Sequence, residues 1–396
     1  MSNIKRRRGF TLSKGINYIV DLAMGNDKPF RKKQAVVGVG ENGTAKTSRM
    51  IARLREVTGK EPVIFNCAFH GEEMVGLPNF NMEDRTSEMF INSNLLKIDN
   101  DGKAHAIIID EFGKGTKQIK RNMSSLLYDR SLNGVKIPDD CIIVALTNYG
   151  SEGLGDSFDP HEMNRATFVH LLKDTVETHL EEYGYSRYEP TLCAWMLQNP
   201  DIATSFLDLD NREFKDLKER VAANSVGIFD PRIPSGEEQY VSYRSLESAD
   251  TNLKLLHEEG YELEDVMEGL VGSVGEKAAN SIVTLIRLAG KMPSPKSVEA
   301  DPENCELPAD GAASSLMLYK LRDTTQVLNS EGVLNPNATQ ARVAKYVKYI
   351  NRMKPEYKVQ FLRGTDKDNR VAEFYGRDDA FGDLCVEYNF IFQADK

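Results

Sequence analysis

The sequence predicts an α/β protein whose core is a parallel sheet with helices on both faces, an αβα sandwich. Three observations support this prediction. Residues 35–39 form an apolar run that is followed by a glycine-bearing turn and a helical pattern. Residues 105–112 and 141–148 contain two further apolar runs, each unbroken until polar residues at its carboxyl end. Unbroken apolar runs are typical of strands buried on both faces of a parallel sheet.

A helix is expected before this core. Within residues 11–24, Ile16, Ile19, Val20 and Ala23 recur at helical spacing on one face. Residues 1–34 are therefore expected to be an N-terminal segment that contains this helix.

The turn after the first core strand has the pattern of a phosphate-binding loop. A strand, a glycine-bearing turn and a helix wrap backbone N–H groups around phosphates at a helix N-terminus. Lys46 would reach the terminal phosphates, and the Thr47 hydroxyl would complete the shell of a Mg²⁺ ion. Ala45 stands where the usual pattern has glycine, so this position is expected not to need a positive φ. The predicted ATP-binding residues are Gly40, Glu41, Asn42, Gly43, Thr44, Ala45, Lys46, Thr47 and Ser48.

A strand at residues 62–66 is expected after the loop's helix, followed by an irregular polar stretch over residues 67–97. This stretch contains the aromatic residues Phe69 and Phe80. It is either an ordinary long loop or a surface that engages a partner, since loops of this length are often functional.

The second core strand ends in two carboxylates, Asp110 and Glu111. In enzymes with such a phosphate loop, the first acid holds Mg²⁺ and the second can polarise the attacking water. An adjacent acid pair can also be a solvated strand end.

Asn133-Gly134, flanked by alternating apolar residues within residues 130–137, predicts a β-hairpin. The next core strand ends at Asn148, where ligands of open α/β sheets gather. Asn148 would hydrogen-bond the attacking water or the γ-phosphate, although an asparagine in this position is also a common turn former.

Four motifs in this order resemble the AAA+ ATPases of the MoxR branch. They are Gly40 to Thr47 with its Thr-Ala-Lys-Thr ending, Ile107 to Phe112, Ala145 to Asn148, and Met163 to Val169. The hairpin at residues 130–137 falls where this clade places one before its sensor 1. The resemblance also implies that extra structure is inserted within residues 67–97 and offers a surface for engaging a client.

The resemblance implies roles for individual residues. Asp110 would be the Walker B metal ligand, with Thr47, Glu111 the catalytic glutamate and Asn148 sensor 1. Arg165 falls where the family has an arginine finger that is donated into the neighbouring subunit's site. Arg165 could equally be a surface salt-bridge residue.

A sensor 2 arginine is implied in the lid, and two residues compete for this role. Arg244 opens a helical pattern that continues through Leu246, Ala249 and Leu253, whereas Arg232 follows a proline, as the branch usually has it. Arg244 is favoured because it lies at a helix start.

The resemblance also implies the domain organisation. The N-terminal helix would pack near the nucleotide, residues 35–172 would form the AAA+ core, and residues 173–290 the helical lid. Residues 291–396 are expected to be a small C-terminal extension of α/β or α+β character.

Composition narrows the functional classes. The net charge of −10 argues against a broad surface for nucleic acid. The five cysteines are scattered singly, as in a reducing compartment, and no segment approaches a membrane span. The protein is expected to be cytoplasmic, with no membrane partner.

The resemblance implies a MoxR-like ATPase that hydrolyses ATP with Mg²⁺ between the subunits of a ring, a hexamer, and remodels a protein partner. A von Willebrand factor A domain protein is the first candidate partner. A nucleotide-gated scaffold with incidental hydrolysis and a DNA-handling AAA+ protein such as a helicase loader are the alternatives.

Overall fold

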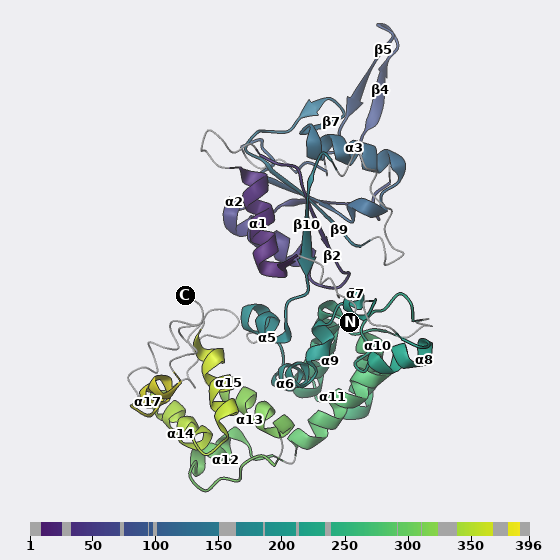
Figure 1. The fold of residues 1–396 in the computed structure, drawn as a ribbon. Helices are drawn as coiled ribbons and strands as arrows, with labels where there is room; N and C mark the ends of the chain where they lie inside the picture. Colours follow the sequence, from purple (N-terminus) through teal and green to yellow (C-terminus); the bar gives the residue numbers. More distant parts are fainter. Residues whose placement is uncertain are drawn as a thin grey trace. The chain divides into compact units, whose positions relative to one another are not determined.

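The computed structural model describes residues 9–25, 33–71, 75–93, 95–97, 101–149, 164–184, 187–210, 214–233, 239–290, 292–309, 311–323, 339–366 and 379–388. The chain divides into two compact units (Figure 1). The first unit spans Met1–Asp174, Thr204–Arg220 and Asp230–Pro234, and the second spans Thr175–Ala203, Val221–Phe229 and Ser235–Lys396.

The first unit contains a six-stranded sheet in the order β1-β10-β2-β9-β6-β3. Every neighbouring pair is parallel, so the carboxyl ends of all six strands lie at one edge. The strands are β1 (Phe10–Thr11), β2 (Val36–Gly40), β3 (Val63–Asn66), β6 (Ala106–Asp110), β9 (Ile142–Thr147) and β10 (Thr167–Leu172).

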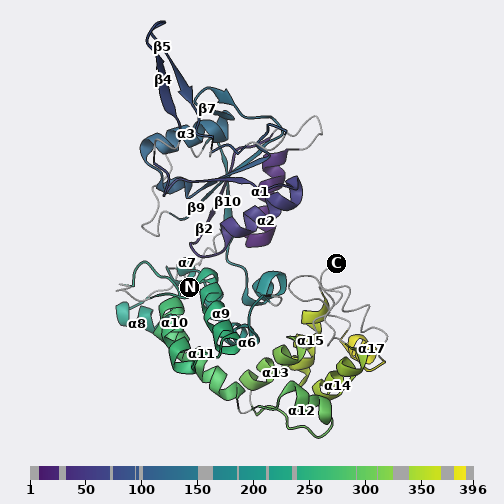
Figure 2. The same ribbon diagram turned by 180° about the vertical axis from the view of Figure 1, so that it is seen from behind.

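Helices cover both faces of this sheet, as Figures 1 and 2 show from opposite sides. α1 (Leu12–Met24) and α2 (Lys46–Thr58) lie on one face, and α3 (Lys117–Tyr128) lies on the other. Ile16, Ile19 and Val20 of α1 pack with Met50 of α2 and with strand residues such as Val144 in one buried cluster. The predicted α/β fold class is confirmed.

Four predicted core strands and the N-terminal helix are confirmed as β2, β3, β6, β9 and α1. Strands β1 and β10 were not predicted. β10 alternates between buried and half-buried residues, and His170 interrupts its apolar run, so it lacks the pattern of the central strands.

The predicted hairpin is β7 (Ser131–Leu132) and β8 (Val135–Lys136). Asn133 and Gly134 have φ angles of 49° and 84°. Two consecutive positive φ angles are what a two-residue type I′ turn requires.

The stretch from residue 67 to 97, whose residue pattern is irregular, contains a second hairpin. β4 (Leu77–Asn81) pairs antiparallel with β5 (Thr86–Phe90), and the hairpin projects from the first unit (Figure 1). All ten strand residues are exposed, so neither strand has the alternation that marks a half-buried strand.

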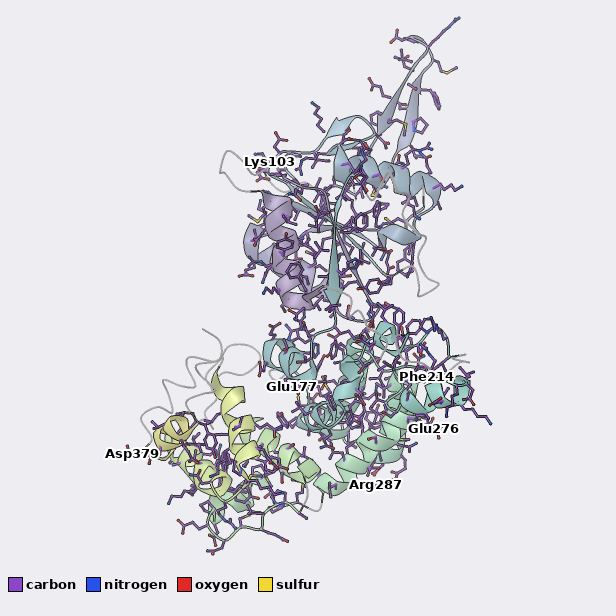
Figure 3. All side chains as sticks on the ribbon, in the orientation of Figure 1. Lys103, Glu177, Phe214, Glu276, Arg287 and Asp379 are labelled. Atoms are coloured by element: carbon purple, nitrogen blue, oxygen red, sulfur yellow. The ribbon has the colours of Figure 1, made fainter. Side chains whose placement is uncertain are left out.

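The second unit is helical, and its larger core surrounds Trp195, Leu246 and Ile282. Glu276 in the first turn and Arg287 in the last turn of α11 complement the helix dipole (Figure 3). The remaining helices of the described chain are η2 (Phe112–Lys114), α5 (Val176–His179), the π-helical turn η4 (Leu180–Gly184), α6 (Pro190–Gln198), η5 (Pro200–Ala203), α7 (Phe206–Asp210), α8 (Leu217–Ala223), α9 (Tyr243–Glu258), α10 (Leu263–Val274), α11 (Glu276–Ala289), α12 (Pro295–Ala300), α13 (Gly311–Asp323), α14 (Gln340–Ile350), α15 (Pro355–Asp366) and α17 (Asp379–Glu387).

The described part of residues 291–396 contains helices only, whereas an α/β or α+β extension was expected. These helices enclose a second core around Leu318, Tyr346 and Leu362. None of the described helices combines the length and the apolar composition that crossing a membrane requires.

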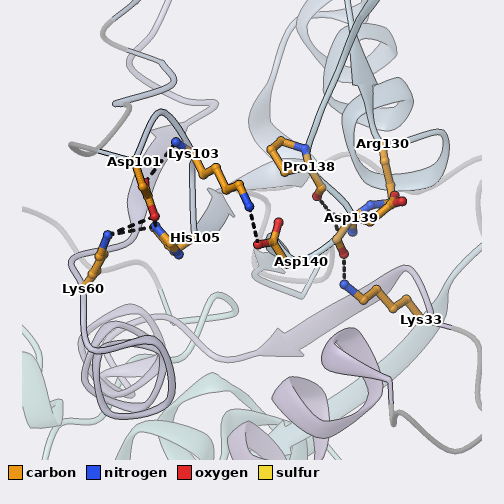
Figure 4. Close-up of polar contacts among 9 residues, drawn as sticks. All are labelled: Lys33, Lys60, Asp101, Lys103, His105, Arg130, Pro138, Asp139 and Asp140. Atoms are coloured by element: carbon orange, nitrogen blue, oxygen red, sulfur yellow. Dashed lines mark hydrogen bonds and ion pairs between the residues drawn. The ribbon is translucent and has the colours of Figure 1, made fainter.

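The edge where β6 and β9 begin is occupied by structural contacts (Figure 4). Arg130 Nη2 donates to the carbonyls of Pro138 at 2.7 Å and Cys141 at 2.6 Å. Lys103 pairs with Asp140 at 3.5 Å. These contacts tie loops together at the edge opposite the carboxyl ends of the strands.

Candidate active site

The predicted phosphate loop joins the end of β2 to the start of α2. Gly43 has a φ of 72°, and Ala45 has a φ of 63°. The expectation that Ala45 would not need a positive φ is therefore wrong. Residues with a Cβ can adopt this left-handed conformation at a cost of roughly 1–2 kcal/mol. Alanine, whose side chain is a single methyl group, is the smallest residue that bears this cost.

Lys46 lies buried at the start of α2. Its ammonium donates to the backbone carbonyls of Gly40, at 3.1 Å, and of Glu41. It also donates to Asn148 Oδ1 at 2.9 Å. An incoming phosphate would compete with two backbone carbonyls for this ammonium. The charge is thus held where the loop could present it to an anion.

Thr47 and Asp110 meet across the site. Thr47 Oγ1 donates to Asp110 Oδ2 at 3.0 Å, and the backbone N–H of Glu111 donates to Asp110 Oδ1 at 3.0 Å. Burial raises the pKa of the Asp110 carboxyl, although both hydrogen bonds oppose this shift. A hydroxyl and a carboxylate side by side are the oxygen ligands that Mg²⁺ prefers.

No cluster of three or more His, Cys, Asp or Glu side chains with metal-site geometry occurs among the described residues. A Mg²⁺ ion at Thr47 and Asp110 would therefore take its other ligands from water and from phosphate oxygens, as is usual for this ion.

Asn148 connects Lys46 to Glu111. Its Nδ2 donates to Glu111 Oε2 at 3.1 Å, while its Oδ1 accepts from Lys46. This is the amide orientation that satisfies both a cation and a carboxylate. Glu111 has a φ of 53° and also pairs with Lys114 at 2.9 Å. Lys114 and Asn148 together fix where the Glu111 carboxylate points.

Sequence reasoning missed two groups around the site. Thr147 Oγ1 accepts from the backbone N–H of Gly113 at 3.1 Å and so fixes the turn that follows Glu111. Lys173 pairs with Glu41 at 3.1 Å, both side chains being buried. The signal for Lys173 was its place directly after a strand, but that strand, β10, was not recognised.

Arg165 is not among the residues that contact one another around the phosphate loop. Its side chain is 59% exposed, and it pairs with Asp129 at 3.6 Å and lies over the ring of Tyr128 at 5.3 Å, at the end of α3. Met163, which opens its motif, lies outside the described residues.

The two candidate sensor 2 residues belong to different units. Arg244 is exposed in the first turn of α9, whose N-cap Ser242 exchanges hydrogen bonds with Ser245 in a capping box. The predicted helix start is confirmed. Arg232 belongs to the first unit, and its backbone N–H donates to Asp230 at 3.0 Å.

No protein-family model matches the chain, and no curated protein sequence does. Solved structures that resemble it include NtrX from Brucella abortus in complex with ADP, with 13% identity over 97% of this chain and 70% of that chain and a TM-score of 0.31. Another is the Holliday junction branch migration motor RuvB of Thermotoga maritima, with 12% identity over 85% and 94% of the two chains and a TM-score of 0.32. Structural similarities of this size carry no argument about function. The function proposed below is therefore argued from the residues described above.

Proposed function

We propose that the chain is an ATPase of the AAA+ type that resembles the MoxR branch and remodels a protein partner. The main support is the convergence of Lys46, Thr47, Asp110, Glu111 and Asn148 at the carboxyl edge of the sheet, joined by hydrogen bonds of 2.9–3.1 Å. A cation, two acids, a hydroxyl and an amide gathered beside a phosphate loop suit phosphoryl transfer to water.

In this proposal the loop amides and Lys46 offset the charge of the triphosphate. Glu111 accepts a proton from the attacking water as the water oxygen bonds to the γ-phosphorus and the bond to ADP breaks. Asn148 holds the Glu111 carboxylate in place for this attack. Thr47 and Asp110 would hold Mg²⁺, which neutralises phosphate charge when bound.

The active site would be completed by a neighbouring copy of the chain. Arg165 is exposed and lies at the end of α3 rather than in the loop, as suits a residue that acts in a neighbouring subunit. A planar guanidinium at the γ-phosphate would neutralise charge that develops during transfer. By resemblance the ring is a hexamer and the partner a von Willebrand factor A domain protein. The five cysteines, none in a disulfide, fit a cytoplasmic location.

The test is the Glu111→Gln variant, which keeps the shape of the side chain and removes its basicity. ATP affinity by calorimetry should stay within a few-fold of the original, while steady-state phosphate release should fall by about 100-fold or more. Glu56→Gln, on the exposed part of α2, is the matched control and should leave both unchanged. Unchanged phosphate release in Glu111→Gln would reject the proposal.

A further inference from the structure

The chain leaves the sheet at Lys173, directly after β10, and this lysine is attached to the phosphate loop. Lys173 Nζ lies 3.1 Å from Glu41 Oε2, with the two side chains only 7% and 9% exposed. The same ammonium donates to the carbonyl of Thr204 at 3.0 Å, and Ser205 Oγ donates to the other Glu41 oxygen. These four residues form a closed polar cluster within the first unit.

Glu41 is the residue on which two cations converge. Its backbone carbonyl accepts from the ammonium of Lys46, and its carboxylate accepts from Lys173 and Ser205. A group that draws Lys46 toward itself would therefore change the contacts of the residue that holds Lys173.

The neighbouring residue fixes the other side of this junction. Asp174 Oδ1 accepts from the backbone N–H of Leu12 at 2.8 Å, and Asp174 Oδ2 pairs with Arg49 at 3.1 Å. The end of β10 is thereby tied to α1 and α2, directly beside the lysine that holds Glu41.

Ser205 carries the connection into α7. Its hydroxyl accepts from the backbone N–H of Leu207 at 3.0 Å, so it caps the helix while it donates to Glu41. Phe206 and Leu209 of α7 are buried. A movement of Glu41 would thus act on the first turn of a packed helix.

We infer that Lys173 is a positioning residue that acts through Glu41, sets the phosphate loop and transmits nucleotide occupancy to residues 204–210. When phosphate draws the Lys46 ammonium away from the Glu41 carbonyl, the loop backbone at Glu41 shifts. A buried carboxylate does not separate from its cation without a large desolvation cost, so Lys173 and Ser205 follow it. This inference rests on the proposed ATP binding.

Hydrogen exchange on the full chain tests this coupling. In the original protein, a non-hydrolysable ATP analogue should change the exchange rate of the amides in residues 204–210 by about tenfold or more. The Lys173→Gln variant, whose amide can still donate to the Glu41 carboxylate but carries no charge, should bind the analogue and lose this change. Lys173→Arg should retain it. Lys103→Met, at the opposite edge of the sheet, is the control and should behave as the original does.

Calorimetry with the same analogue separates the two possible failures. If no binding is measured, the proposed function fails, and the inference with it. If binding is measured but residues 204–210 show no change, or if Lys173→Gln shows the same change as the original protein, the inference alone is overturned. A merely structural role would lower stability without removing the nucleotide response.

Discussion

The neutral side chain of Asn148 contacts two groups of opposite charge. Its carbonyl faces Lys46 and its amide faces Glu111. The bridging amide keeps the Lys46 ammonium from pairing directly with Glu111, whose carboxylate pairs with Lys114 instead. The site therefore depends on hydrogen-bond direction as well as on charge.

Ala45 allows a prediction about backbone strain. Ala45→Gly should leave the free energy of unfolding unchanged or raise it by up to about 1 kcal/mol, because glycine adopts a φ of 63° without a Cβ clash. Ala52→Gly, at an exposed position in the middle of α2, is the matched control and should lower it by about 1 kcal/mol. Urea denaturation measures both. Equal losses in the two variants would show that the loop is not strained.

Cys67 gives a prediction about pH. Burial, together with the charges of Asp110 and Glu111, raises the pKa of the Cys67 thiol to about 12. The unfolded thiol loses its proton near pH ~8.5, so the free energy of unfolding should fall as pH rises above this value, by about 1.4 kcal/mol per pH unit for this group.

The comparison is between the original protein and Cys67→Ala, unfolded in urea at several pH values from 7.5 to 10, values chosen to bracket the thiol's ordinary range of about 8.5. The variant should lose less stability across this range, by the share of one thiol. Cys305→Ala is the comparison: burial also raises the pKa of this half-buried thiol, but the shift is smaller, so a smaller difference from the original protein is expected. Parallel pH curves for the original protein and Cys67→Ala would contradict the prediction.

Among the elements, the β4–β5 hairpin has strands whose ten residues are all exposed, so none of them belongs to a buried core. Its exposed side chains include Leu77, Phe80, Met89 and Phe90, and Met82 lies in its turn. A two-stranded hairpin is marginally stable alone in water, so apolar side chains on its surface favour a role in contacting a partner.

Replacing residues 77–90 with a short Gly-Ser turn tests this division of roles. The melting temperature should change by no more than about 2 °C, and basal ATP hydrolysis should be retained, because all ten strand residues are exposed and none belongs to a buried core. Scanning calorimetry and phosphate release measure the two quantities. Loss of folding would show that the hairpin stabilises the core, and the β7–β8 hairpin, whose Leu132 is buried, is the element for which that loss is expected.

At the scale of the whole molecule, the proposed ring predicts complementation between two inactive variants. Arg165→Ala should bind ATP but hydrolyse it poorly, as Glu111→Gln should. A one-to-one mixture should recover up to about a quarter of the original activity, because that share of interfaces in a random ring joins an intact Glu111 to an intact Arg165.

Phosphate release from the mixture, measured after the subunits have exchanged, gives the result. The two variants measured separately at the same total protein concentration are the controls. Activity in the mixture no higher than the mean of the separate variants would contradict shared sites. Full activity of Arg165→Ala alone would assign this arginine to its surface ion pair with Asp129.

The sequence by itself determined the central strands, the phosphate loop and the Asn133-Gly134 hairpin, because their signals are local. Burial on both faces requires unbroken apolar runs, and a type I′ turn requires residues that accept positive φ. The placement of Asp110, Glu111 and Asn148 at one edge also follows from parallel strands that end in polar residues.

Only the tertiary structure decided the insertion of β10 between β1 and β2, the positive φ of Ala45 and the pairing of Lys173 with Glu41. It also decided that residues 77–90 pair as a hairpin. The first three depend on neighbours that are distant in the chain or on a backbone turn imposed from both ends, and the hairpin has two exposed strands without alternation. Such constraints leave no periodic pattern in the residues themselves.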